Sequence, residues 1–113
     1  MATIKLIIKQ NDLEPPLQVT LLDGTTPVDL TSASEVRFLM KTGTTLKVSA
    51  VMTVADQSIL ANHGKVSYNW VTGDTDTVAQ YSAEIQVIWP TARPQTFPVD
   101  KYFVVDVQKD LGP

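Results

Sequence analysis

Apolar and polar residues alternate along most of this chain, and the alternation marks a series of β-strands. Successive side chains of a strand point to opposite faces of a sheet, so a period of two indicates one buried and one exposed face. The pattern predicts strands near residues 4–9, 17–21, 35–41, 46–50, 65–70, 81–89 and 103–108. On the segment 46–50, Leu46, Val48 and Ala50 are expected to face inward. The alternation lapses over residues 55–64, where we expect a loop or one helical turn.

Turn-forming residues separate these segments. Asp23-Gly24 is a strong hairpin signal, because glycine accepts the positive φ of a tight turn. Pro15-Pro16 indicates a bend between the first two strands, because proline cannot donate to a strand ladder. Three prolines between residues 90 and 98 predict a long hairpin loop before the last strand.

The predicted elements define the fold class. About seven to eight strands at roughly ten-residue spacing, with no segment of helical period, predict an all-β antiparallel β-sandwich, immunoglobulin-like or jelly-roll-like. The content of 14 Val, 14 Thr and 6 Ile supports this, because β-branched residues favour strands. At 113 residues we expect one domain, residues 1–113, in which residues 1–10 form an edge strand or a docking arm.

Tyr81 begins the longest alternating segment, directly after a polar corner at residues 76–80. In immunoglobulin-like folds a tyrosine at such a corner ties its hydroxyl to upstream backbone, and a core residue follows two positions later. Tyr81 is therefore predicted to be a structural corner, with Ala83 in the core. The alternative is a tyrosine that only packs at the start of a strand.

Charge and composition exclude several classes of protein. Nine basic and twelve acidic residues give a net charge of -3, so we expect neither a nucleic acid nor a membrane as partner. The absence of cysteine excludes a disulfide scaffold, a thiolate metal site and a thiol nucleophile, and it fits production in a reducing cytoplasm. Lysines interrupt the first apolar run, so we expect a soluble protein without a secretory signal.

Candidate chemistry is sparse. His63 is the single histidine, and it precedes a glycine in what we interpret as a solvated turn. No nucleophile-elbow or phosphate-loop motif occurs, so we expect no enzyme, with no catalytic, cofactor-binding or metal-ligating residues and no cofactor. Asp74 and Asp76 are expected to cap turns rather than to bind calcium, because the spacing of a calcium loop is absent.

Four aromatic residues allow two interpretations. They could line a sugar-binding platform, or they could pack in the core, and all four fall on inward sets of their strands. We therefore expect core packing for Tyr68, Trp70, Tyr81 and Trp89.

Six apolar residues fall on faces that the alternation predicts to be solvent-exposed. If they cluster, they would form a patch of the kind that marks an interface. A shifted register on one strand would instead move such residues inward. We predict an interface formed by Ile7, Leu22, Leu39, Val51, Ile88 and Val104.

An ordered series of short motifs runs from about residue 10 to residue 108. The series comprises Asp12 with Pro16-Leu17, Leu22-Asp23-Gly24-Thr25, Pro27-Val28-Asp29-Leu30, Val36-Arg37-Phe38-Leu39-Met40, Gly64-Lys65-Val66 with Tyr68 and Trp70, Asp74-Thr75, Tyr81-Ser82-Ala83-Glu84, Trp89, and Thr96-Phe97-Pro98 before Tyr102. In this order the motifs resemble the N-terminal domain family of phage upper baseplate proteins and related small tailed-phage virion proteins.

The resemblance implies a non-enzymatic structural protein of a tailed-phage virion, assembled in the host cytoplasm. Such a protein would dock on other virion proteins in the baseplate or tail, as a homo-oligomer or in many copies. A capsid decoration (cement) protein on the phage head is the alternative within this class. A carbohydrate-binding β-sandwich module is the alternative from another class. The sequence leaves open the location in the particle, the copy number and symmetry, the partners, the strand pairing order, and any bound glycan or calcium.

Overall fold

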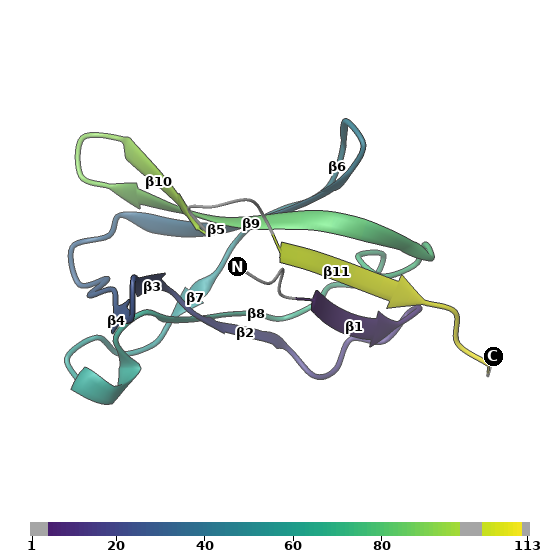
Figure 1. Ribbon diagram of the computed structural model, residues 1–113, viewed down its shortest axis with the longest axis horizontal. Coiled ribbons are helices and arrows are strands. Elements are labelled where there is room, and N and C mark those ends of the chain that lie inside the picture. The colour runs from purple at the N-terminus through teal and green to yellow at the C-terminus, as the bar shows by residue number, and fades with distance from the viewer. Residues whose placement is uncertain (1–4, 98–102, 112–113) are drawn as a thin grey trace.

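Two β-sheets face each other in this protein (Figure 1). The structure is a computed structural model that describes residues 5–97 and 103–111. Within these ranges the helical content is one 3-10 turn, η1, at Leu60–Asn62. The prediction of an all-β sandwich is therefore confirmed. No helix in the described part of the chain has the length and apolar character needed to cross a membrane.

The larger sheet contains six strands among the described residues. Its order is β1-β11-β9-β5-β6, and β10 pairs with β9 beside that path. β1 runs parallel to β11, and the other pairs are antiparallel. The strands are β1 (Lys5–Lys9), β5 (Glu35–Thr42), β6 (Thr45–Val51), β9 (Ala79–Trp89), β10 (Arg93–Phe97) and β11 (Phe103–Gln108).

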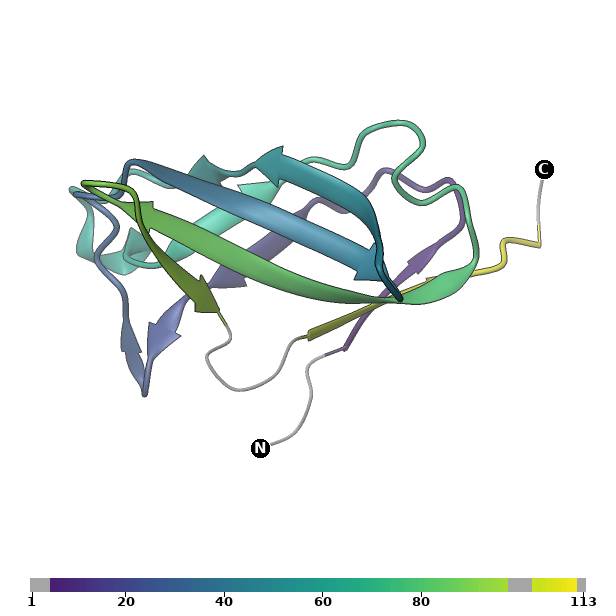
Figure 2. The ribbon, with the colours of Figure 1, turned by 90° about the horizontal axis from the view of Figure 1, so that it is seen from above.

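The smaller sheet has the order β2-β8-β7, and Figure 2 shows it behind the long strands of the larger sheet. Its strands are β2 (Leu17–Thr20), β7 (Thr53–Val54) and β8 (Lys65–Tyr68). A separate two-stranded ribbon contains β3 (Leu22–Asp23) and β4 (Thr26–Pro27). The order β11-β9-β5-β6 against β2-β8-β7 corresponds to strands G-F-C-C′ against B-E-D of an immunoglobulin-like sandwich.

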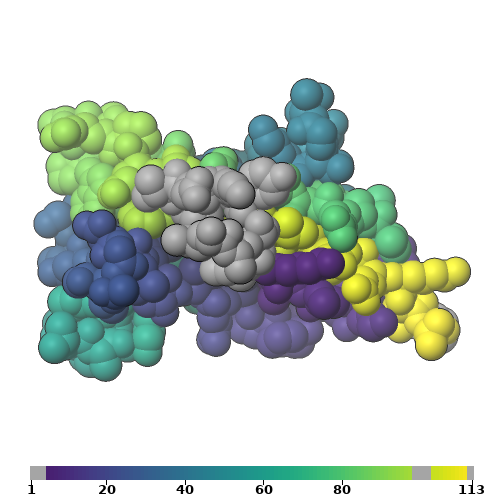
Figure 3. All heavy atoms as spheres, viewed as in Figure 1, coloured from purple at the N-terminus to yellow at the C-terminus, as the bar shows by residue number. Residues whose placement is uncertain are grey.

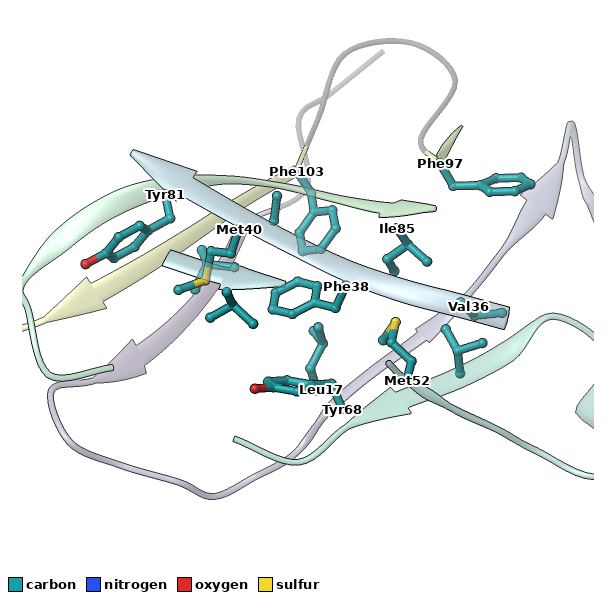
Figure 4. Close-up of a cluster of buried hydrophobic side chains, with 14 of the residues drawn as sticks. Leu17, Val36, Phe38, Met40, Met52, Tyr68, Tyr81, Ile85, Phe97 and Phe103 are labelled. Carbon is teal, nitrogen blue, oxygen red and sulfur yellow. The ribbon is translucent and has the colours of Figure 1, made fainter. Parts of the chain in front are cut away.

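Phe38 lies at the centre of the core between the sheets (Figure 4). Its ring centroid is 5.2 Å from that of Tyr68, 5.8 Å from that of Trp70 and 6.2 Å from that of Phe103. Burial of one such ring contributes up to about 3 kcal/mol to folding. The alternation on β5, β9 and β11 correctly assigned the inward residues of these three strands.

Leu46 departs from the predicted alternation. It was expected to face inward with Val48, but it is 54% exposed. The pairing of β5 with β6 passes from Met40 opposite Val48 to Lys41 opposite Leu46, which leaves Lys47 as an extra residue. This bulge reverses the alternation between Val48 and the hairpin turn, so Leu46 points outward.

The region of the three prolines is also different from the prediction. Instead of a long loop, β9 turns over residues 90–92 and returns as β10. Thr91 and Ala92 make this turn with φ of 64 and 58. Pro94 fits within β10 because, in the described part of the chain, β10 pairs with β9 alone and so leaves one edge unpaired. Pro98 lies outside the described residues.

β1 is an edge strand of the larger sheet. Ile8 is buried in the core, and the side chain of Lys5 lies 3.3 Å from the carboxylate of Asp106 on β11. The first four residues of the segment 1–10 lie outside the described residues. The described part of this segment is therefore integrated in the sandwich.

Candidate docking surfaces

Five of the six residues predicted to form an interface lie on one face of the molecule. Strand register places all five on the outer face of the larger sheet, opposite the core. Ile7 and Val51 are 56% and 57% exposed, and the other three are partly buried by their neighbours. These five residues are Ile7, Leu39, Val51, Ile88 and Val104.

Polar side chains separate these apolar residues. Arg37 is paired in register with Val51, and Glu35 is paired with Ile88. Arg37 and Glu35 also bind each other, with Nε donating to a carboxylate oxygen at 3.0 Å. The outer face is therefore a mixture of apolar and charged positions rather than one continuous apolar patch.

The outer face has a shallow hollow beside the β5–β6 hairpin. It is lined by Leu39, Lys41, Leu46, Ser82 and Glu84. The β5–β6 and β9–β10 hairpins rise on the same side of the sheet. Figure 3 shows them as two projections, and the molecular surface is lower between them. This outer face is the first candidate docking surface.

Leu22, the sixth residue of the predicted interface, lies at one end of the sandwich. It belongs to β3 and is 46% exposed. The β3–β4 ribbon, η1 and the β9–β10 turn all gather at this end (Figure 1). In immunoglobulin variable domains, the loops of the corresponding end bind antigen. We call this end, formed by residues 21–34, 55–64 and 90–92, the loop end.

The loop end exposes two further apolar residues that the sequence did not single out. Ile59 and Leu60 begin the 3-10 turn, and they are 51% and 79% exposed. Together with Leu22 they give the loop end an apolar character. The loop end is the second candidate docking surface.

The side chain of Gln57 joins two loops of the loop end by hydrogen bonds. Its side-chain oxygen accepts hydrogen bonds from the backbone N–H groups of Leu30 at 3.0 Å and Gly64 at 3.3 Å. Its side-chain nitrogen donates to the carbonyl oxygens of Ala55 and Asn62, each at 2.8 Å. The buried amide thus uses its two donors and two acceptor positions, which holds residues 21–34 against residues 55–64.

His63 belongs to the same connection. Its Nε2 lies 2.9 Å from the carbonyl oxygen of Gln57 and 3.9 Å from a carboxylate oxygen of Asp29. Only 21% of its side chain is exposed, so the prediction of a solvated turn residue is wrong. The side-chain hydroxyl of Thr31 donates to Asp29 and holds the pKa of that carboxyl below its usual value. His63 is therefore packed into the loop end, where its ring contacts the backbone of Gln57.

The aromatic residues divide into two groups. Tyr68, Trp70 and Tyr81 are buried, as expected of core residues. Trp89 packs only partly against the core, and its Nε1 donates to the side-chain oxygen of Gln95 at 2.9 Å. Of these four residues, Trp89 alone is only partly buried.

Tyr81 makes the backbone contact expected of a corner tyrosine. Its hydroxyl donates to the carbonyl oxygen of Thr77, four residues upstream, at 3.0 Å. Ala83, two positions later, is 1% exposed and lies in the core. The contact fixes the path of the chain into β9.

Asp74 and Asp76 both accept hydrogen bonds in the connection before β9. Asp74 accepts one from the hydroxyl of Tyr68 at 2.5 Å and one from the N–H of Val71 at 2.9 Å. Asp76 binds Nζ of Lys47 at 2.6 Å. Within residues 5–97 and 103–111, no three His, Cys, Asp or Glu side chains gather in a group able to hold a metal ion.

Similarity to known proteins gives no information on either candidate surface. No protein-family model matches the chain. No curated protein matches it either.

Proposed function

We propose that this chain is a non-enzymatic structural protein of a tailed-phage virion, which docks on other virion proteins in the baseplate or tail. The observation that carries the proposal is the loop end, where Leu22, Ile59 and Leu60 are exposed on connections that Gln57 holds together. The resemblance of the motif series to phage upper baseplate domains supplies the particle and the location.

A fixed apolar surface suits docking for an energetic reason. Binding costs free energy when loops and side chains must be ordered at the interface, and this cost falls when the surface is already ordered. Apolar side chains at the centre of an interface contribute much of the affinity. The hydrogen bonds of Gln57 order the loop end before any partner arrives, so the exposed apolar residues contribute more of their burial to binding.

The proposal has two alternatives. A cement protein on the phage head would use the same surfaces in a different location. A carbohydrate-binding module would need exposed aromatic rings, and Trp89, which lines a shallow pocket with Arg93, Pro94 and Gln95, is its best candidate. Glycan binding that is lost in a folded Trp89→Ala variant would favour that module over a docking protein.

Electron microscopy of tailed-phage particles, labelled with an antibody against this chain, tests the location. Label on the baseplate or tail is the expected result. Label on the capsid would favour the cement protein. Absence of the chain from purified particles, checked by mass spectrometry, would overturn the proposal.

Substitution of the loop end tests the docking surface. Leu60→Asp adds a charge to a side chain that is 79% exposed, so the fold is expected to survive while docking is lost. Val71→Asp is the matched control, because Val71 is 59% exposed in the connection between β8 and β9, at the other end of the sandwich. The amount of each variant in purified particles is the measurement. Equal incorporation of both variants would exclude the loop end as the docking surface.

A further inference from the structure

Four residues of the outer face, near the β5–β6 hairpin, form a quadrilateral of alternating character. On β5 and β9, Leu39 is paired in register with Glu84, and Lys41 is paired with Ser82. Lys41 and Glu84 therefore occupy one diagonal, and Leu39 and Ser82 occupy the other. The residues of these pairs lie about 5 Å apart across the strands, and residues two apart along a strand are separated by roughly 7 Å.

The two charged residues on the diagonal have no ion partner in the described part of the chain. The ion pairs found there involve Lys5, Arg37, Lys47 and His63, and neither Lys41 nor Glu84 takes part in one. Neither side chain makes a hydrogen bond with another described residue. Among the residues that the structure describes, Lys41 and Glu84 are thus a cation and an anion without partners, and they flank Leu39 in the hollow.

This arrangement is complementary to itself. A two-fold axis lying in the plane of the face, along the diagonal from Leu39 to Ser82, exchanges the positions of Lys41 and Glu84. In two copies related by that axis, each Lys41 faces Glu84 of the other copy, and Leu39 faces Leu39. Isologous contacts of this kind are the commonest in symmetric protein dimers.

We propose that the outer face of the larger sheet binds a second copy of this chain across this two-fold axis. Leu39 of each copy loses water at the centre, two reciprocal Lys41–Glu84 pairs flank it, and Leu46 lies beyond Lys41 on β6. Exposed ion pairs add little affinity, so apolar burial supplies the attraction, and the charges select the register.

The direction of the axis sets the angle at which the two copies cross. The axis lies oblique to the strands, so the strands of the two copies cross at roughly a right angle, as in orthogonal packing of sheets. The β5–β6 and β9–β10 hairpins rise on the same side of the sheet as the proposed contact. The molecule measures 43 × 27 × 27 Å, so a crossed arrangement places a short dimension over a long one.

The inference rests on the proposed docking role, because it names one partner of an assembling subunit. Its test uses the purified chain alone. Dimerisation can therefore fail while incorporation into particles succeeds, and the reverse can also be observed. The two hypotheses are distinguished by separate measurements.

Charge reversal at the two diagonal positions provides the test. Sedimentation equilibrium of the wild-type chain over a concentration series is expected to show a reversible monomer–dimer equilibrium, with a monomer of 12.4 kDa. Lys41→Glu and Glu84→Lys each place like charges opposite each other twice, so each is expected to weaken association by about tenfold or more. An equimolar mixture of the two variants is expected to form heterodimers, because one variant carries both anions and the other carries both cations.

Two controls complete the design. The double variant with Lys41→Glu and Glu84→Lys restores both pairs and is expected to dimerise as the wild type does. Lys65→Glu, on the outer face of the smaller sheet, changes the charge equally and is expected to leave association unchanged. A fall in wild-type association with added salt gives a measurement that needs no variant. A monomeric wild type, dimers unaffected by either single reversal, or a mixture without heterodimers would overturn the inference.

Discussion

The side-chain oxygen of Gln57 accepts a hydrogen bond from the backbone N–H of Leu30, 27 positions earlier in the chain. The two residues belong to different connections at the loop end. At this point the backbone N–H groups of Leu30 and Gly64 donate to the side-chain oxygen of Gln57, where in a sheet they would donate to a neighbouring strand. The shape of the loop end therefore depends on one side chain.

Replacement of Gln57 by alanine is expected to destabilise the fold by about 3 kcal/mol, because buried backbone groups of both connections lose their partners. Urea unfolding followed by tryptophan fluorescence measures this loss. Gln18→Ala is the control, because Gln18 is exposed on β2. A change below about 0.5 kcal/mol for Gln57→Ala would show that water replaces the amide without cost.

Gly64 marks a second close contact at the loop end. Its φ is +79, and a Cβ atom there would lie 2.5 Å from the carbonyl oxygen of Leu21. Gly64→Ala is therefore expected to cost about 3 kcal/mol or more, from strain and from the displaced backbone. Gly43→Ala is the control: its φ is +58 and its Cβ would meet nothing within 4 Å, so only the φ strain of about 1 kcal/mol applies. Equal unfolding midpoints for the two variants would contradict the close contact.

Tyr81→Phe removes the hydroxyl that binds the carbonyl oxygen of Thr77 and leaves the buried ring in place. The expected loss of stability is about 1 kcal/mol. Thr77→Ala keeps the backbone acceptor and should cost less, which makes it the matched control. If the loss is larger for Thr77→Ala than for Tyr81→Phe, the corner contact does not stabilise the fold.

Tyr68 gives the fold a dependence on alkaline pH. Burial raises the pKa of its phenol, and the hydrogen bond to Asp74 raises it further. The unfolded phenol ionises near pH 10, so the stabilising contribution is complete below that pH. It is lost as the pH rises from there towards the folded pKa, because the unfolded chain then releases a proton that the folded chain keeps.

Tyr68→Phe is therefore expected to flatten the decline of stability between about pH 9 and pH 11. Urea midpoints measured across this range test the prediction. In parallel, ultraviolet absorbance should show that Tyr68→Phe lacks a tyrosine that, in the wild type, ionises only as the protein unfolds. An unchanged slope in Tyr68→Phe would assign the alkaline decline to other groups.

The sequence predicted those parts of the fold that depend on local alternation. β5 and β9 have one buried and one polar face, and their inward residues follow directly from the period of two. Tyr81 was identifiable because its contact with Thr77 spans four residues. Such features are visible within a window of about ten residues.

Other parts depend on pairing between distant segments. The outward position of Leu46 follows from one extra residue, Lys47, in the ladder between two strands. The quadrilateral around Leu39 exists only because β5 and β9 pair in one register. Gln57 resembles any polar loop residue until residues 21–34 are folded against it. The sequence held no local signal for these three features.

The parallel pairing of β1 with β11 has a mechanical consequence. Force applied to the chain before β1 and after β11 would draw the two strands along their length in opposite directions. The five register pairs, from Lys5 with Val104 to Lys9 with Gln108, would then share the load and break together. A pull across the open end of the β5–β6 hairpin, between residues 35 and 51, would instead break its bonds one after another.

A force-ramp experiment on single molecules is expected to give a higher rupture force for the first geometry than for the second, and equal forces would contradict this difference. Under such a load the β1–β11 ladder would hold the two ends of the sandwich together until all five pairs give way.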